Sequence, residues 1–158
     1  MVKIVVLGLG NEIIADDAIG ILAAQALKSQ LGDEVDVIES SVAGMALMEI
    51  MMDYDKAILI DAIVTGDNPP GSILEMKPEQ LGHVIAPSAH YAGIPEVIAL
   101  AHQMQIHFPD EIAIFAVEVK DALTIGGEIS TEVRQALPAL CAKVQEQIQR
   151  WKSEPGAE

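Results

Sequence analysis

The sequence predicts an α/β protein whose mostly parallel sheet is covered by helices on both faces. Short runs of β-branched and aliphatic residues alternate along the chain with longer segments of helical period. The runs are apolar at nearly every position, as is typical of parallel strands that are buried on both faces. With 158 residues, 51% of them hydrophobic, the chain can enclose a sizeable core within one domain.

Each expected element follows from a local pattern. Apolar runs predict buried strands at 3–7, 35–38, 57–60 and 111–119, and an edge strand at 72–76 after a Pro-Pro-Gly turn. Apolar residues at helical spacing predict helices at 16–32, 42–52, 94–106 and 130–151. Pro138 predicts a kink in the last helix. Residues 77–93 show no clear period and are expected to form a long loop, which is often a functional feature.

The domain is expected to cover residues 1–152, with a frayed tail at 153–158. The chain carries 24 acidic and 9 basic residues, a net charge of −15. Such a chain repels phosphate, so nucleic acid and anionic membranes are not expected as partners. A single cysteine, Cys141, permits no disulfide framework. Neither a signal peptide nor a membrane span is recognisable, and a cytoplasmic protein is expected.

In parallel sheets, sites form at the carboxyl ends of the strands. The first expected strand leads into Gly8-Leu9-Gly10, the start of a possible dinucleotide fingerprint. The fingerprint is incomplete, because Ile13 stands where a third glycine is needed. The acidic residues Asp16 and Asp17 would also repel a pyrophosphate. A nucleotide-binding oxidoreductase domain is therefore disfavoured.

Three carboxylates follow expected strands. Asp16 and Asp17 open a helix, where capping and helix-dipole complementarity are the plainest interpretation. Adjacent helical residues point about 100° apart, so one could cap while the other faces a cleft. Asp61 interrupts an apolar run at the expected end of the 57–60 strand. A carboxylate there needs a partner, and both a turn-forming role and a functional role remain open.

The histidines contain no H-E-x-x-H zinc motif. His90 lies in the expected loop, shortly before a helix. With Asp17 and Asp61 it would form a mixed nitrogen and oxygen set, which suits zinc, nickel, cobalt or iron better than calcium or magnesium. Serine or cysteine nucleophilic catalysis is not expected, because no G-x-S-x-G elbow exists and Cys141 lies in an apolar helix. Methionines 45, 48, 51 and 52 are expected to fill the core.

Taken together, the motifs resemble those of the hydrogenase maturation endopeptidases. The matching segments are Gly8-x-Gly10-Asn11-x4-Asp16-Asp17-x-x-Gly20, Ala43-Gly44-Met45, Ile60-Asp61-Ala62 and Ser88-x-His90-x-x-Gly93. Their order and spacing match from residue 1 to about 150. The sequence departs from many relatives at Ser40-Ser41, Ala18 and Glu12, which bears on loop conformation and substrate choice.

The resemblance implies a three-layer α/β/α fold with a five-stranded sheet. It implies an endopeptidase, aspartic-type or metal-assisted, that removes a C-terminal extension from the large-subunit precursor of a nickel-iron hydrogenase after nickel insertion. The catalytic and metal-contacting positions would be Asp17, Asp61 and His90. The nickel would be carried by the substrate, so the resting enzyme would need no metal, and a monomer is expected.

Two other classes remain open from the sequence. One is a non-catalytic chaperone or binding module for a nickel protein, which would bind a precursor without shortening it. The other is a free-standing metallopeptidase, which would hold its own metal at rest. Whether the metal polarises the carbonyl or activates water, or whether a carboxylate acts as general base, also remains open.

Overall fold

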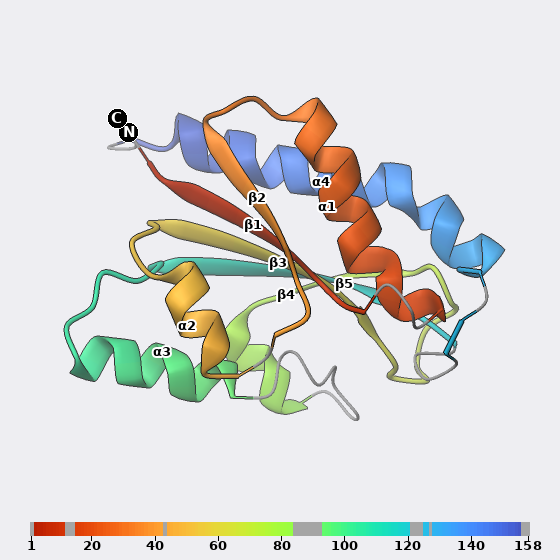
Figure 1. Cartoon of the computed structure of the whole chain (residues 1–158), viewed down its shortest axis with the longest axis horizontal. Helices are drawn as coiled ribbons and strands as arrows, with labels where there is room; N and C mark the ends of the chain where they lie inside the picture. Colours follow the sequence, from red (N-terminus) through yellow and green to blue (C-terminus); the bar gives the residue numbers. More distant parts are fainter. Residues whose placement is uncertain are drawn as a thin grey trace.

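The computed structural model describes residues 2–11, 15–42, 44–83, 93–120, 125–126 and 128–155. The strands are β1 (Ile4–Leu9), β2 (Val35–Ser40), β3 (Lys56–Ile63), β4 (Ile73–Met76) and β5 (Glu111–Glu118). The α-helices are α1 (Ile19–Gln30), α2 (Ala46–Met51), α3 (Ile94–Gln103) and α4 (Thr131–Ser153). Two 3₁₀ helices, η1 (Ala15–Ala18) and η2 (Pro78–His83), precede α1 and follow β4. The expected alternation of strands and helices is confirmed (Figure 1).

The five strands form one sheet in the order β2-β1-β3-β5-β4. β1 runs parallel to β2 and β3, and β3 runs parallel to β5. β4 runs antiparallel along the outer side of β5, at the sheet edge as expected. The mostly parallel five-stranded sheet is therefore confirmed, and the carboxyl ends of β1, β3 and β5 meet at one end of it.

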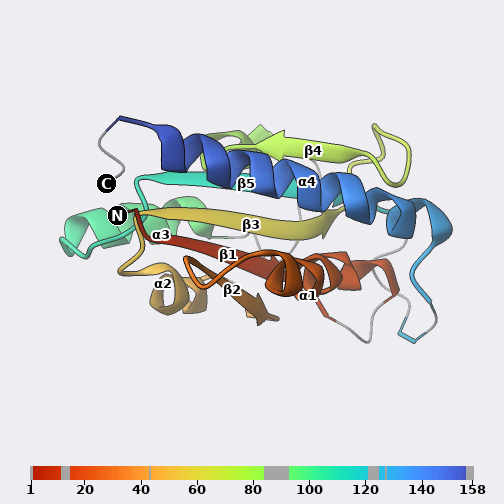
Figure 2. The same ribbon diagram turned by 90° about the horizontal axis from the view of Figure 1, so that it is seen from above.

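Helices cover both faces of the sheet. α1 and α4 pack on one face, and α2 and α3 pack on the other, which gives three layers (Figures 1 and 2). Side chains of each strand alternate between the two cores. In β3, for example, Ile58 and Ile60 face α1 and α4, whereas Leu59 and Ile63 face α2 and α3.

The strand expected at 57–60 is longer than predicted. β3 begins at Lys56 and continues through Asp61 to Ile63. Ala62 and Ile63 extend the ladder with β5, in which Asp61 lies opposite Ala116. Asp61 therefore lies within the sheet, two residues before the strand ends, and not at its terminus.

The helix expected at 42–52 is shorter, because α2 covers only Ala46–Met51. Gly44 has a φ of +59°, which is incompatible with an α-helix through this position. The methionines consequently differ. Met51 is buried and Met48 packs partly against the core, but Met45 and Met52 at the helix ends are 49% and 36% exposed. The prediction that all four fill the core is wrong for these two.

The loop expected at 77–93 contains η2 at Pro78–His83, while residues 84–92 lie outside the described residues. α4 continues through Pro138, the eighth residue of the helix, as one helical element. Within the described part of the chain, no helix combines the length and the apolar character needed to cross a membrane.

Candidate active site

Glycines allow the start of α1 to lie directly against the sheet. A Cβ on Gly20 would lie 2.1 Å from the carbonyl oxygen of Leu9 and 2.5 Å from that of Ile60. A Cβ on Gly8 would lie 2.3 Å from the carbonyl oxygen of Gly20. Such approaches are closer than packed atoms permit, so side chains here would force the helix away from β1 and β3. The glycines that suggest a dinucleotide fingerprint therefore serve helix–sheet packing.

The same packing places Asp17 at the carboxyl end of the sheet. A Cβ on Gly10, the residue after β1, would lie 2.2 Å from the carbonyl oxygen of Asp17. The short helix η1, which contains Asp17, also contacts β3. The Asp17 side chain is half-buried. The residues of η1 thus lie beside the strand that carries Asp61.

Asp61 is completely buried within β3. Its Oδ1 accepts a hydrogen bond of 2.7 Å from the Ala62 N–H. Leu59 and Ile63 lie two positions before and after Asp61 on the strand, and both face the core under α2 and α3. Because residues two positions apart point to the same face of a sheet, Asp61 points to that side. Placing a carboxylate at such a position costs free energy that a leucine would not, which favours a functional reason for its presence.

His90, the third member of the expected set, lies outside the described residues. The segment that contains it leads to Gly93, which begins α3 with a left-handed φ of 84°. A Cβ on Gly93 would lie 3.6 Å from the Cα of Gly44, just before α2. The start of α3 therefore belongs to the side of the sheet that Asp61 faces. Among described residues no group of three His, Cys, Asp or Glu side chains could hold a metal ion.

Asp16 differs in role from Asp17. It is 2% exposed, and its carboxylate accepts hydrogen bonds from the N–H and the hydroxyl of Ser130 at 2.7 and 3.0 Å. Ser130 is the N-cap residue of α4, whereas the N-cap residue of α1 is Ala18, which provides no side-chain hydrogen bond. Asp16 therefore anchors the start of a distant helix and does not cap its own.

Glu118 is a buried carboxylate that the sequence analysis missed. It is 2% exposed and lies at the end of β5, opposite Ile63. It accepts hydrogen bonds from the Thr65 N–H at 2.8 Å, from the Gly66 N–H at 3.4 Å and from the Thr65 hydroxyl. Glu118 thereby holds the turn that follows β3. An acidic residue at the end of an apolar run, as at Asp61, was the signal that could have identified it.

Other candidate groups lie away from this end of the sheet. His107 contacts Asp55 at 2.8 Å, and the Lys3 N–H together with His107 lowers the pKa of the Asp55 carboxyl.

Cys141 is buried in the core, and burial raises the pKa of its thiol. A thiol that resists ionisation is a poor nucleophile, which agrees with the expectation that Cys141 takes no part in nucleophilic catalysis.

The combination of this fold with Asp17 in η1 and Asp61 near the end of β3 can be compared with known proteins. The sequence profile of the family described as hydrogenase maturation protease (HycI) matches residues 21–147. The chain belongs to the hydrogenase maturation protease family. The resemblance inferred from the motifs is thereby confirmed.

Individual members of the family agree with this assignment. Hydrogenase 2 maturation protease of Escherichia coli (strain K12) is 30% identical over 150 residues, which cover 87% of this chain and 90% of that protein. The solved structure of the hydrogenase maturating endopeptidase HybD from E. coli superposes with a TM-score of 0.79 at 27% identity, covering 94% and 93% of the two chains. HybD from Thermococcus kodakarensis has the same fold, with a TM-score of 0.73 at 24% identity over 92% and 98% of the chains.

Proposed function

We propose that this maturation protease removes the C-terminal extension of a nickel-iron hydrogenase large-subunit precursor once nickel has been inserted. Water would add across one peptide bond, releasing a short peptide and leaving a new C-terminal carboxylate on the large subunit. Asp17, Asp61 and His90 would contact the nickel centre that the substrate carries, so that the resting enzyme needs no metal of its own. We also infer that it acts as a monomer in the cytoplasm.

One observation supports the proposal most strongly. The glycine-mediated contact of α1 with the sheet places η1 over β1 and β3, and so gathers Asp17 and Asp61 at one end of the sheet. The two residues are 44 positions apart in the sequence. Oxygen ligands of this kind, completed by an imidazole, fit a borderline transition metal such as nickel.

The roles of the residues follow from their surroundings. Asp61 is rigid, because it is buried in a strand and accepts a hydrogen bond from Ala62. A rigid carboxylate can fix the position of a bound group without loss of side-chain entropy. Asp17 is more accessible and could hold a substrate ligand or accept a proton from the attacking water. In either role, Asp17 would act together with Asp61 close to the scissile bond.

The test is the intact mass of a nickel-loaded large-subunit precursor after incubation with the protein. We expect the precursor to lose a C-terminal peptide that appears as a second species in the spectrum. Stable co-elution of the two proteins with an unchanged precursor mass would instead support a binding module that never cleaves. A purified resting protein with stoichiometric bound metal would support a free-standing metallopeptidase.

A further inference from the structure

The sheet has an incomplete edge at the amino end of β5. β4 pairs with the second half of this strand only, from Met76 opposite Ile114 to Ile73 opposite Val117. Residues 111–113 extend beyond β4. Continuing the register, the residue opposite Ile112 would be Pro78, which has no N–H to donate and begins η2 instead. The proline therefore explains why β4 stops.

The backbone of Ile112 points to this open side. The Glu118 N–H donates to the carbonyl oxygen of Ser72, on the side of β4, whereas the Val119 N–H donates to Ile63 of β3. Backbone groups alternate in direction along a strand, so those of Ile112 point the same way as those of Glu118. No strand of the described chain lies there to bond its N–H and C=O. Unpaired groups of this kind are a template for another strand.

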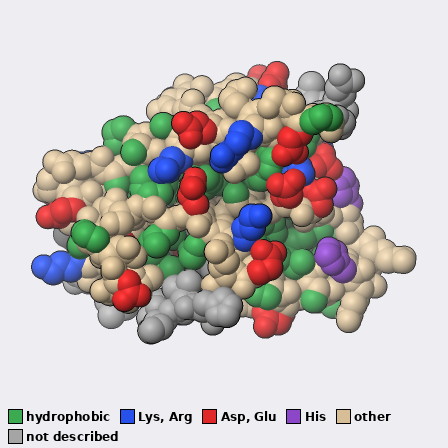
Figure 3. Space-filling view, turned by 180° about the vertical axis from the view of Figure 1, so that it is seen from behind, with side chains coloured by type: hydrophobic (Ala, Val, Ile, Leu, Met, Phe, Trp, Pro, Cys, Tyr) green, Lys and Arg blue, Asp and Glu red, His purple; other side chains and the backbone are tan. Residues whose placement is uncertain are grey.

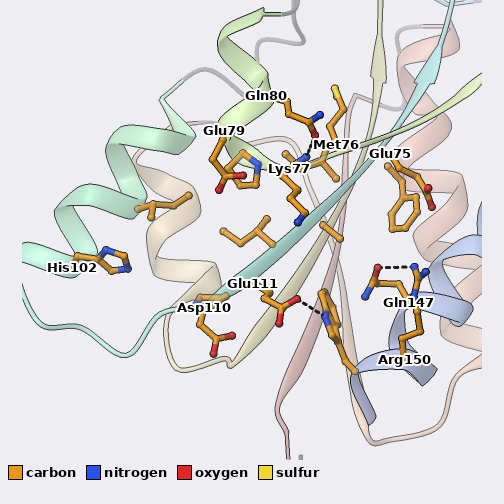
Figure 4. Close-up of a pocket in the computed structure, with 18 residues that line it drawn as sticks. Glu75, Met76, Lys77, Glu79, Gln80, His102, Asp110, Glu111, Gln147 and Arg150 are labelled. Atoms are coloured by element: carbon orange, nitrogen blue, oxygen red, sulfur yellow. Dashed lines mark hydrogen bonds between the residues drawn. The ribbon is translucent and has the colours of Figure 1, made fainter. Parts of the chain in front are cut away.

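A cavity of about 550 Å³ lies over the open edge (Figure 4). On the side of α3 it is lined by Ile98 and Ile112, and on the side of α4 by Gln147, Arg150 and Trp151. An added strand would place the side chain opposite Ile112 toward α3 and its two neighbours toward α4, because side chains alternate. The cavity therefore fits an extended peptide with an apolar residue between two polar ones.

The charges around the cavity favour a basic peptide. Four carboxylates line it, those of Glu75, Glu79, Asp110 and Glu111, against the two cations Lys77 and Arg150. Lys56, beside the cavity, lies 2.9 Å from both Asp110 and Glu111. Glu75 and Glu79 form no ion pair with any described residue. Figure 3 shows acidic and basic side chains interspersed over this side of the molecule, and the net charge of −15 adds a long-range attraction for cations.

We propose that the edge of β5 at Glu111–Ala113 binds an extended, basic segment of a partner protein, which continues the line of β4 along the sheet. Its backbone bonds the N–H and C=O of Ile112, one apolar side chain packs on Ile98, and a basic residue beyond the end nearest β4 approaches Glu75 and Glu79. The site lies at the opposite end of β5 from Glu118, and the inference does not depend on the proposed cleavage reaction.

The test uses amide hydrogen exchange measured by NMR on the full chain. The probe is an amidated peptide of alternating valine and threonine with two lysines at each end. In the free protein we expect the Ile112 amide to exchange at least tenfold faster than that of Ile114, and saturating peptide to slow it at least tenfold. The Val37 amide, on the outer side of β2 at the other sheet edge, should not change.

Two charge variants provide a matched comparison. Glu79→Lys at the cavity should weaken peptide binding at least threefold, whereas Glu49→Lys, an equal charge change on α2, should leave the affinity unchanged. Unchanged Ile112 exchange at millimolar peptide would overturn the proposal. Equal slowing at Val37, or equal weakening by both variants, would also overturn it, since binding would then be nonspecific.

Discussion

Carboxylates are held differently at the two ends of the sheet. At the amino end of β5, Lys56 lies 2.9 Å from both Asp110 and Glu111. At the carboxyl end, Asp16 and Glu118 are buried and accept hydrogen bonds from backbone N–H groups and hydroxyls. Asp110 and Glu111 thus have a cationic partner, whereas the hydrogen bonds that Asp16 and Glu118 accept come from neutral donors.

The difference indicates what each end is for. A cation offsets the charge of its carboxylate, so the ion pairs of Lys56 with Asp110 and Glu111 contribute to stability. Neutral donors stabilise a carboxylate but leave its negative charge in place. Carboxylate oxygens are possible ligands for the metal of a substrate, which is the role proposed for Asp17 and Asp61 at the carboxyl end. Four experiments, ordered by expected effect, test this contrast.

The largest effect is expected from Asp61→Asn. The amide oxygen can still accept the hydrogen bond from Ala62, so the fold should persist, but the charge is lost. We expect the cleavage rate of a nickel-loaded precursor to fall by about 10³-fold, within the range of lost general acid–base or ligand groups. Asp110→Asn at the other end is the matched control and should cleave at the wild-type rate. Cleavage by Asp61→Asn at more than a tenth of that rate would contradict the assignment.

Gly20→Ala should affect stability most. The added methyl group would lie 2.1 Å from a backbone oxygen of β1, so α1 must shift. We expect the free energy of unfolding to fall by about 3 kcal/mol, as for overpacked cores, when measured by urea denaturation. A Cβ on Gly32 would meet no atom within 4 Å. Gly32→Ala should therefore change stability little, and equal losses in both variants would show that close packing is not the cause.

The adjacent residues Asp16 and Asp17 should separate stability from activity. Asp16→Ala leaves the partly buried Ser130 donors without the carboxylate that accepts their hydrogen bonds, so we expect a loss of about 2 kcal/mol in the free energy of unfolding. Asp17→Asn should leave the unfolding transition nearly unchanged and slow cleavage. Urea denaturation gives the free energy of unfolding of both variants, and intact mass over time gives their cleavage rates. A stable but inactive Asp16→Ala together with an unstable but active Asp17→Asn would contradict the roles assigned to the two residues.

The smallest effect concerns pH at the amino end. Hydrogen bonds from Lys56 and Trp151 lower the pKa of the Glu111 carboxyl below its ordinary 4.5. Because the folded pKa is below the unfolded one, this stabilisation is present above about pH 4.5 and is lost as pH falls through the folded pKa. The Glu111 side chain is 52% exposed, so the contribution is about 1 kcal/mol or less.

The comparison of wild type with Lys56→Met isolates that contribution. The stability difference between the two proteins should be greatest near pH 6 and should shrink toward pH 3, as measured by urea denaturation at each pH. A difference that stays constant over this range would show that Lys56 stabilises through packing of its aliphatic chain and not through its charge.

Local patterns predicted most of the fold because strands and helices depend on nearby residues. The apolar runs located all five strands, and the polar interruption of one of them identified Asp61. The length of β3 was underestimated because an acidic residue was taken as the end of a strand, whereas the flanking residues Ala62 and Ile63 continue the ladder.

The partners of buried carboxylates could not be predicted locally. Asp16 bonds Ser130, which lies 114 positions away, and Glu118 bonds Thr65, 53 positions away. Such pairs depend on how the helices and strands pack, and no sequence pattern indicates them. The contact between Gly20 and β3 is equally long-range, yet it is what places Asp17 near Asp61. His90 lies outside the described residues and stays a prediction.

The central claim is that the carboxylates at the carboxyl end recognise the nickel of the substrate. Its most direct test compares initial cleavage rates of the same precursor with and without inserted nickel, followed by intact mass. We expect cleavage of the loaded precursor only, with no product from the empty one. Cleavage at equal rates would contradict nickel recognition by Asp17 and Asp61, even though the protein would still be a protease.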